Sequence, residues 1–440
     1  MKSLKEHNKL TLPEDFDFQG LESYLQDVWK HRYTLYDEQD EEEQNTSTQQ
    51  FLSFLREQEV KAGHYVGFVQ FKDLQLCIYP KLFDSLKNDN VSLFYRHLLY
   101  WLSYCRRINF PFNKVEAELS YLNDFPEALV HYFAKHTLHL LQQHPYHQFE
   151  LIEETLPQVK GRLLTSRYIN ECITKGNFHH LVCEHEPLLF DNTLNSIIKF
   201  VTRRLLQRSR FKETWYYLEQ IIFVLDEVED EVVTARDCDR VKLNPLFTDY
   251  KECLDMCRFF LNNEQIKGLQ GSDDQFCFLL PMNYVFEDFL CGFIEDKFRG
   301  QFKAVYQHGG WLTDQRVFRI MNDLGIKNEV NDLLLIVDAK YKLRQRNVDA
   351  KKGINQADLY QMAAYAIRQN CKKVLLLYPL LYSHKPTHQT DTFTISSELF
   401  DGTISVTAAD LHICSLDTRE LDEHVYQQLE ELFNELLNTD

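Results

Sequence analysis

The chain has 440 residues, of which 44% are hydrophobic and 13% aromatic, and its formal net charge is −18. This length exceeds that of one ordinary hydrophobic core and predicts two or three domains. The negative charge excludes a protein that coats nucleic acid by bulk electrostatics, because phosphate binding requires concentrated Lys and Arg. Any contact with nucleic acid must therefore be local.

The N-terminal segment lacks the apolar core of a signal peptide, and no apolar run approaches the roughly 20 residues of a membrane helix. We therefore expect a cytoplasmic protein with no membrane partner. Eleven cysteines in such a chain indicate reduced thiols rather than a disulfide framework. Cys253 and Cys257 lie one helical turn apart and could present two thiolates to zinc. Without a second pair at ligand spacing, the sequence favours ordinary buried cysteines.

Residues 1–90 are the first predicted domain, which contains β-structure. The acidic segment 36–50, YDEQDEEEQNTSTQQ, is interpreted as a solvated loop or insertion, with a docking strip for a basic partner as the alternative. Residues 65–83 then place two β-rich runs around the turn-like KDLQ. This pattern predicts a hairpin that ends at Pro80.

Residues 91–270 are the second predicted domain, which is helical. Apolar residues recur at helical spacing in three segments, 91–110, 125–144 and 192–211. Their aromatic and leucine side chains are interpreted as core. Polar residues and glycines between Asn262 and Gln275 indicate a domain boundary.

Residues 271–440 are the third predicted domain. The predicted elements are a helix at 283–298, β-rich runs at 317–326 and 332–342, a helix at 356–370, a strand at 372–382 and a hairpin at 392–410 that turns at Asp401-Gly402. This alternation predicts a mixed sheet flanked by helices, so the fold class is α/β.

Two aspartates meet if the β-rich runs pair as an antiparallel hairpin. A turn centred between Val330 and Asn331 places Asp323 opposite Asp338, with Cβ atoms roughly 4.5–5.5 Å apart, where like charges are destabilising. Lys340 projects from the same face as Asp338 because side chains alternate along a strand. Two carboxylates beside a lysine suit Mg²⁺, which prefers a few hard oxygen ligands and retains waters. A salt-bridged strand end without function is the alternative that geometry leaves open.

A magnesium ion at this position could polarise a phosphodiester and lower the pKa of bound water, while Lys340 orients the nucleophile or stabilises developing charge. The run KYKLRQR and the lysines at Lys351 supply a basic rim. Gln361 and Tyr365 share one helix face, although they could simply pack. Glu287 lies among aromatic residues on the first helix of the domain, where a carboxylate could reach the metal or remain solvated.

The motif order resembles the PD-(D/E)xK nuclease superfamily: Glu287 on a helix, Asp323, the triplet 338–340 (Asp-Ala-Lys), and Gln361 four residues before Tyr365. Within that superfamily the chain is most similar to McrC, the nuclease subunit of McrBC methylcytosine-dependent restriction systems. The stretch DAKYK followed by DLYQMAAYA is the most specific part of this likeness.

Further segments extend the resemblance along the chain. VGFVQFKDLQLCIYPKL near the front, VKGRLL from Val159 and FDNTLNSIIKFV from Phe190 are also similar to McrC segments. One position departs from the pattern, because Asn322 stands where the superfamily name gives proline. That position shapes the backbone and binds no metal.

The resemblance implies roles for the site residues. Asp323 and Asp338 would bind the catalytic Mg²⁺, with the Ala339 carbonyl nearby, and Lys340 would assist the attacking water. Glu287 would be a further metal ligand. Gln361 would be a further catalytic residue.

The resemblance also implies a partner, an McrB-like AAA+ GTPase that recognises methylated double-stranded DNA and whose hydrolysis the McrC subunit stimulates. GTP would be bound by that partner and not by this chain, which has no G-x-x-x-x-G-K-[ST] phosphate loop. The part of the chain before residue 270 would then dock on the partner.

The leading hypothesis is a Mg²⁺-dependent DNA endonuclease subunit that acts when its nucleotide-driven partner delivers DNA. A rival hypothesis is a catalytically inactive regulatory subunit that docks on an AAA+ ring and stimulates its GTPase. A third hypothesis is a nuclease that needs no motor. The net acidity and Asn322 motivate the rival hypothesis.

Overall fold

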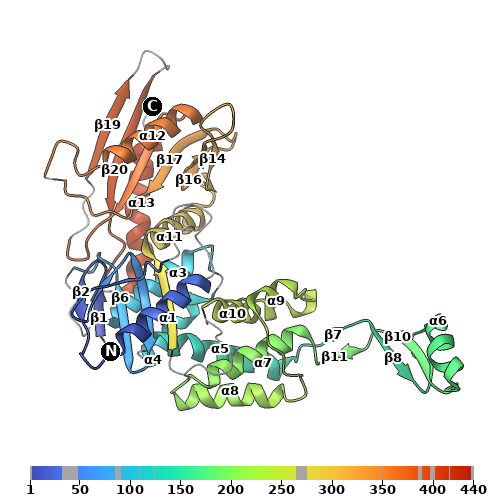
Figure 1. The fold of residues 1–440 in the computed structure, drawn as a ribbon. Helices are drawn as coiled ribbons and strands as arrows, with labels where there is room; N and C mark the ends of the chain where they lie inside the picture. The colour runs from blue at the N-terminus through green and yellow to red at the C-terminus, as the bar shows by residue number, and fades with distance from the viewer. Residues whose placement is uncertain are drawn as a thin grey trace. The chain divides into compact units, whose positions relative to one another are not determined.

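The computed structural model describes residues 2–31, 48–84, 91–108, 110–122, 124–263, 275–346, 348–384, 389–396, 402–415 and 417–437 (Figure 1). The chain divides into two compact units, one of residues 1–125 with 263–440 and one of residues 126–262. Most of the acidic segment (36–47) and most of the predicted boundary (264–274) lie outside the described residues.

The first unit contains a sheet built from segments that lie far apart in the sequence. Its order is β1 (Lys2–Lys5), β6 (Leu74–Tyr79), β5 (Tyr65–Phe71) and β12 (Gln275–Pro281). Strands β5 and β6 pair antiparallel, which confirms the predicted hairpin. Strand β12 pairs with β5 over its whole length. The predicted boundary at 270/271 therefore does not separate two domains, because this seven-residue ladder joins the segments on either side of it.

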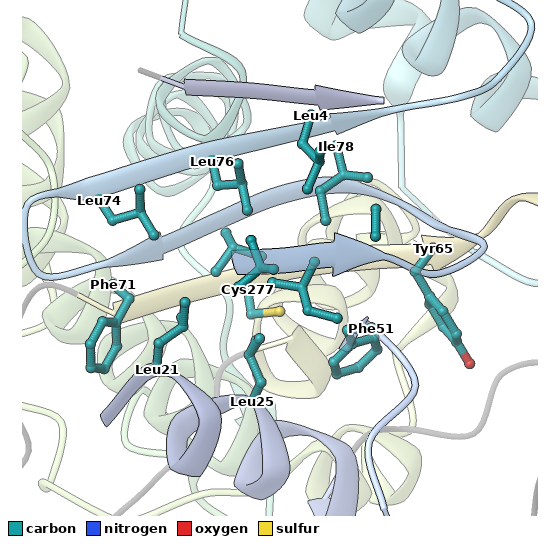
Figure 2. Packing of buried hydrophobic residues seen from close by; sticks show 14 of the residues in the cluster. Leu4, Leu21, Leu25, Phe51, Tyr65, Phe71, Leu74, Leu76, Ile78 and Cys277 are labelled. Carbon is teal, nitrogen blue, oxygen red and sulfur yellow. The ribbon is translucent and has the colours of Figure 1, made fainter. Parts of the chain in front are cut away.

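Helix α1 (Phe18–His31) covers one face of this sheet (Figure 2). Leu21 and Leu25, four residues apart on one helix face, are fully buried in a cluster with Phe71, Leu76 and Cys277. A separate small sheet has the order β2 (Lys9–Thr11), β4 (Glu59–Ala62) and β3 (Leu52–Phe54). Hydrophobic burial thus fixes the N-terminal part of the unit.

Helix α3 (Val91–Tyr104) also belongs to the first unit and is followed by α4 (Phe112–Leu122). The predicted boundary at 90/91 therefore also falls inside this unit, because α3 packs on α11 (Met282–Lys297). Gly292 permits the close approach of these helices, since a Cβ there would lie 1.9 Å from the Tyr104 carbonyl oxygen.

A six-stranded mixed sheet forms the C-terminal part of the first unit and confirms the predicted α/β class (Figure 1). Its order is β13 (Lys303–Tyr306), β16 (Leu324–Lys327), β17 (Leu333–Ala339), β18 (Lys373–Pro379), β20 (Thr403–Leu411) and β19 (Thr390–Ser396). The pairs β17–β18 and β18–β20 are parallel, and the others are antiparallel. The predicted hairpin at 392–410 is present as β19 and β20, although Asp401 of its turn lies outside the described residues.

Helix α12 (Gln356–Gln369) connects the parallel strands β17 and β18, as a parallel pair requires. Met362 and Ala366 bury one face of α12 against Ile336, Val374 and Ala408. Helix α13 (Leu421–Leu437) ends the described chain, and a side hairpin of β14 (Gly309–Trp311) and β15 (Arg319–Met321) precedes β16. The predicted helix at 356–370 and the strand at 372–382 are confirmed.

The second unit combines helices with short strands. Its helices are α5 (Phe125–Gln143), α6 (Thr165–Arg167), α7 (Thr193–Leu206), α8 (Lys212–Val224), α9 (Ala235–Arg240) and α10 (Tyr250–Asn263). Its strands are β7 (Gln148–Phe149), β8 (Ile152–Leu156), β9 (Arg162–Leu163), β10 (Leu181–His185) and β11 (Leu188–Leu189). Short helical turns lie at Tyr168–Cys172, Ile173–Lys175 and Pro245–Phe247, and in the first unit at Thr418–Glu420.

The predicted helices at 125–144 and 192–211 are confirmed, but a uniformly helical middle is wrong for residues 148–189. Strands of two to five residues are too short to show a period. All eleven cysteines are free and buried. Cys253 and Cys257 lie inside α10, as the sequence favoured, and burial raises the pKa of the Cys257 thiol well above its usual range. Of the helices described, none combines the length and apolar character needed to cross a bilayer.

Candidate active site

The site begins with the pairing register of β16 and β17. Leu324 pairs with Val337 and Gly325 pairs with Ile336. Asp323 precedes β16 by one residue, so this register places it opposite Asp338, as predicted. A shift in the ladder between Ile326 and Lys327 lies toward the turn and leaves the pairing next to Asp323 unchanged.

Hydrogen bonds hold both the carboxylate and the backbone of Asp323. Its Oδ2 accepts a hydrogen bond from the Ala339 N–H at 2.7 Å, across the two strands. Its own carbonyl oxygen accepts from the Gln307 N–H at 2.9 Å and from the Cys291 thiol at 3.5 Å. These contacts fix the side chain beside the end of β17, so the two aspartates share one end of the strand pair.

Lys340 lies against Asp338, which confirms that the two side chains share a face. The Lys340 Nζ is 2.7 Å from Asp338 Oδ2, and the Asp338 residue is only 2% exposed. The Nζ also donates to Gln361 Oε1 at 3.4 Å, and Gln361 Nε2 donates to the Tyr365 hydroxyl at 3.1 Å. Helix α12 therefore brings the predicted Gln361 and Tyr365 to the predicted lysine.

The carboxylates of the site repel one another in a buried setting. Burial raises the pKa of Asp323 well above its usual range, and the charges of Asp338 and Glu287 raise it further. Burial also raises the pKa of Asp338, while Lys340 partly offsets the rise. Burial raises the pKa of Glu287 to about 7, with Arg107 opposing and Asp338 adding to the shift. Glu287 thus lies within electrostatic reach of both aspartates.

Lys340 carries a positive charge at neutral pH. Burial disfavours the ammonium, but the charge of Asp338 and its hydrogen bond outweigh burial, so the pKa of Lys340 is raised. The side chain therefore supplies a fixed cation next to two carboxylates. Such a group stabilises negative charge that develops nearby and does not serve as a neutral base in this state.

The donor set fits Mg²⁺ in its chemistry. Across the described residues, no three His, Cys, Asp or Glu side chains form a ready-made metal site. Mg²⁺, however, is commonly held by one or two carboxylates, with waters and substrate phosphates completing its shell. Asp323 and Asp338 supply two such carboxylates, and burial raises the pKa of both.

Arg107 is a site neighbour that sequence reasoning missed. Its guanidinium lies 5.7 Å from the centre of the Tyr306 ring. Burial disfavours its charge, yet Tyr306 and Glu287 raise the pKa of Arg107. The loop that carries it is held by Asp288, whose Oδ2 accepts from the backbone N–H groups of Arg106 and Arg107 at 3.1 and 3.3 Å. The only feature of the local sequence that could have indicated Arg107 was the pair of arginines after α3.

The predicted basic rim is partly used inside the domain. Lys342 Nζ donates to Asp358 at 2.8 Å, and the fully buried Arg344 donates to Asp410 at 2.6 Å. Lys351 is exposed. Fewer cations of this segment are therefore available to phosphates than the sequence suggested.

Comparison with known proteins places the chain in a family. A family model described as "McrBC 5-methylcytosine restriction system component" matches residues 60–379, about three quarters of the chain, and this range includes every candidate site residue. A search of curated proteins found no match.

Two solved structures are similar. One is a chain of the half-complex from the tetradecameric assembly of Thermococcus gammatolerans McrB AAA+ hexamers with bound McrC, with 16% identity, a TM-score of 0.69, and coverage of 98% of this chain and 99% of that chain. The other is a chain of the cryo-EM structure of the T. gammatolerans McrBC complex, with 18% identity, a TM-score of 0.48, and coverage of 66% and 85%. At these identities the first likeness shows a shared fold.

Proposed function

Because the chain belongs to the family of McrBC 5-methylcytosine restriction system components, we propose that it is the nuclease subunit of such a system. It acts in the cytoplasm as a Mg²⁺-dependent endonuclease that hydrolyses phosphodiester bonds in methylated double-stranded DNA. The observation that carries this proposal is the pair of opposed carboxylates, Asp323 and Asp338, with the Lys340 ammonium 2.7 Å from Asp338.

The proposal includes a nucleotide-driven partner. The similar T. gammatolerans assembly contains McrB AAA+ hexamers with bound McrC. We extend this arrangement to the present chain, which would dock on an McrB-like AAA+ GTPase through its part before residue 270 and stimulate GTP hydrolysis. The partner binds the GTP, because this sequence has no phosphate-loop motif.

In phosphodiester hydrolysis each of the site residues would have a separate role. Asp323 and Asp338 would hold Mg²⁺, with Glu287 nearby as a further carboxylate. The ion, when bound, polarises the phosphodiester and lowers the pKa of a bound water. Lys340 keeps its positive charge beside the phosphate and stabilises the negative charge that develops there. Gln361 accepts a hydrogen bond from Lys340 and so orients the ammonium.

The direct test compares wild type with Asp338→Asn in Mg²⁺-dependent cleavage of methylated DNA, with the partner and GTP present. We expect the variant to lose cleavage by about 100-fold or more, because it removes a carboxylate from the ion and an ion pair from Lys340. Asp332→Asn is the matched control, since Asp332 is exposed in the turn of the same hairpin. An Asp338→Asn protein that cuts as fast as wild type would show that this assignment is wrong.

A regulatory subunit without catalysis is the second candidate. Asn322 favours it, because a buried asparagine that donates to Gln369 Oε1 at 2.8 Å occupies the position before the first aspartate. This candidate predicts full stimulation of the partner's GTPase with no DNA cleavage in Mg²⁺ or Mn²⁺. Cleavage that depends on Asp338 rejects it.

A further inference from the structure

The side hairpin of β14 and β15 exposes large apolar side chains next to the candidate active site. Within its loop, Val317 is 68% and Phe318 is 63% exposed, and Trp311 and Leu312 are also exposed. A water-soluble surface rarely gathers several such side chains in one short segment without a binding role.

Two cations flank the most exposed pair. Arg316 precedes Val317 and Arg319 follows Phe318, and both arginines are exposed. The sequence Arg-Val-Phe-Arg thus presents an apolar centre between two positive charges. This pattern suits a DNA groove, where apolar side chains enter between base steps and cations contact the phosphates on either side.

The hairpin is fixed to the helix that serves the active site. Asn322 Nδ2 donates to Gln369 Oε1 at 2.8 Å, at the end of α12. Arg368 Nε donates to the Trp311 carbonyl at 2.7 Å. The same helix carries Gln361, which contacts Lys340. Strand β15 also leads within two residues to Asp323, so the apolar loop has a defined position relative to the carboxylates.

We propose that the loop between β14 and β15 is a DNA wedge that inserts Val317 and Phe318 between base steps of the duplex held at the Asp323–Asp338 site. Arg316 and Arg319 contact the flanking phosphates. This inference rests on the proposed nuclease function, and it identifies the loop between β14 and β15 as the element that distorts the DNA. The continuity with the carboxylates and the two flanking cations favour DNA over a protein partner as the occupant.

The test uses the double variant Val317→Ser/Phe318→Ser in the full chain, assembled with its partner and GTP. The probe is a methylated duplex with 2-aminopurine near the cleavage position, and an Asp338→Asn background keeps it uncut. We expect the parent to increase 2-aminopurine fluorescence through unstacking, and the double variant to lose this increase. Its dissociation constant should rise about tenfold or more, as for the loss of a stacked aromatic side chain.

The matched control is Val330→Ser, because Val330 is also exposed but lies in the turn between β16 and β17. This variant should behave as its parent does. A further variant, Arg316→Gln/Arg319→Gln, should weaken the dependence of DNA affinity on salt concentration. The slope of log K against log salt concentration should fall by about 2, as expected for the loss of two phosphate contacts.

The outcomes separate the wedge from the nuclease assignment. The wedge is overturned if wild type cleaves DNA and the double variant, in the Asp338-intact chain, cleaves and binds equally well. It is also overturned if the double variant changes only self-association, measured by sedimentation. Unstacking that depends on Val317 and Phe318, with no cleavage by wild type, supports the wedge and contradicts the nuclease proposal.

Discussion

Replacement of Glu287 by glutamine should stabilise the metal-free protein at alkaline pH and at the same time impair Mg²⁺-dependent cleavage. Glutamine keeps the size of the side chain and removes a charge that burial and Asp338 both disfavour. The pKa of Asp323 should also fall, because one of the like charges that raise it is gone. A gain in stability that accompanies a loss of activity is expected of charges that are retained for function.

The magnitude follows from the raised pKa. Burial first, and then Asp338 and Asp288, raise the pKa of Glu287 from 4.5 to about 7. A folded-state pKa above the unfolded value means that the folded protein binds more protons, so stability falls as pH rises from 4.5 to about 7. At about 1.4 kcal/mol per unit, the full cost is about 3 kcal/mol above this window, and it vanishes below pH 4.5.

Denaturant unfolding without divalent ions measures the effect. The free energy of unfolding of Glu287→Gln should match wild type near pH 4 and exceed it by about 3 kcal/mol near pH 8.5. Addition of Mg²⁺ should stabilise wild type more than the variant. Glu329→Gln, at an exposed glutamate in the turn between β16 and β17, should show neither change. A difference that is the same at both pH values would refute the electrostatic reasoning.

Two further predictions concern the scaffold of the first unit. The buried His97 accepts a hydrogen bond at Nε2 from the Ser415 N–H at 3.0 Å, and burial lowers the pKa of His97 to about 4. The folded state therefore binds fewer protons than the unfolded state, and about 3 kcal/mol of stability is lost as pH falls from 6.5 to about 4. Denaturant unfolding of His97→Gln should show a free energy of unfolding that depends less on pH in this range. Gly292→Ala should lower the free energy of unfolding by about 1–3 kcal/mol, because its Cβ would lie 1.9 Å from the Tyr104 carbonyl oxygen. Gly310→Ala is the control for the same denaturant unfolding measurement and should be tolerated, because the nearest neighbour of its Cβ would be 3.9 Å away.

Local pattern was enough to predict the elements around the carboxylates. Asp323 and Asp338 lie in one short hairpin, so a register assumed from its turn placed them opposite each other, and the observed pairing of Leu324 with Val337 agrees. Alternation along one strand then predicted that Asp338 and Lys340 share a face, and the structure places them in contact. The helical spacing of Gln361 and Tyr365 likewise predicted their shared face. Each of these inferences needed only neighbours within one element or one hairpin.

The parts that escaped prediction depend on distant pairing. Arg107 comes near Glu287 because Asp288 binds the backbone of a loop about 180 residues earlier in the chain. No periodicity in either segment encodes that contact. The exposure of Val317 and Phe318 was equally hidden, since both belong to the predicted β-rich run 317–326, whereas strand β15 begins only at Arg319.

The six-stranded sheet depends on the N-terminal part of the chain in a way that the predicted domains did not anticipate. Tyr341 follows Lys340 and is buried, and its hydroxyl donates to Glu6 at 2.8 Å. Its carbonyl accepts from Lys81 Nζ at 3.0 Å. Strand β12 adds a ladder to β5 immediately before α11, the helix that carries Glu287. A buried polar group that loses its partner costs about 1–3 kcal/mol. Residues 271–440 therefore gain part of their stability from residues that precede them, and Glu6 and Lys81 hold the residue that follows Lys340.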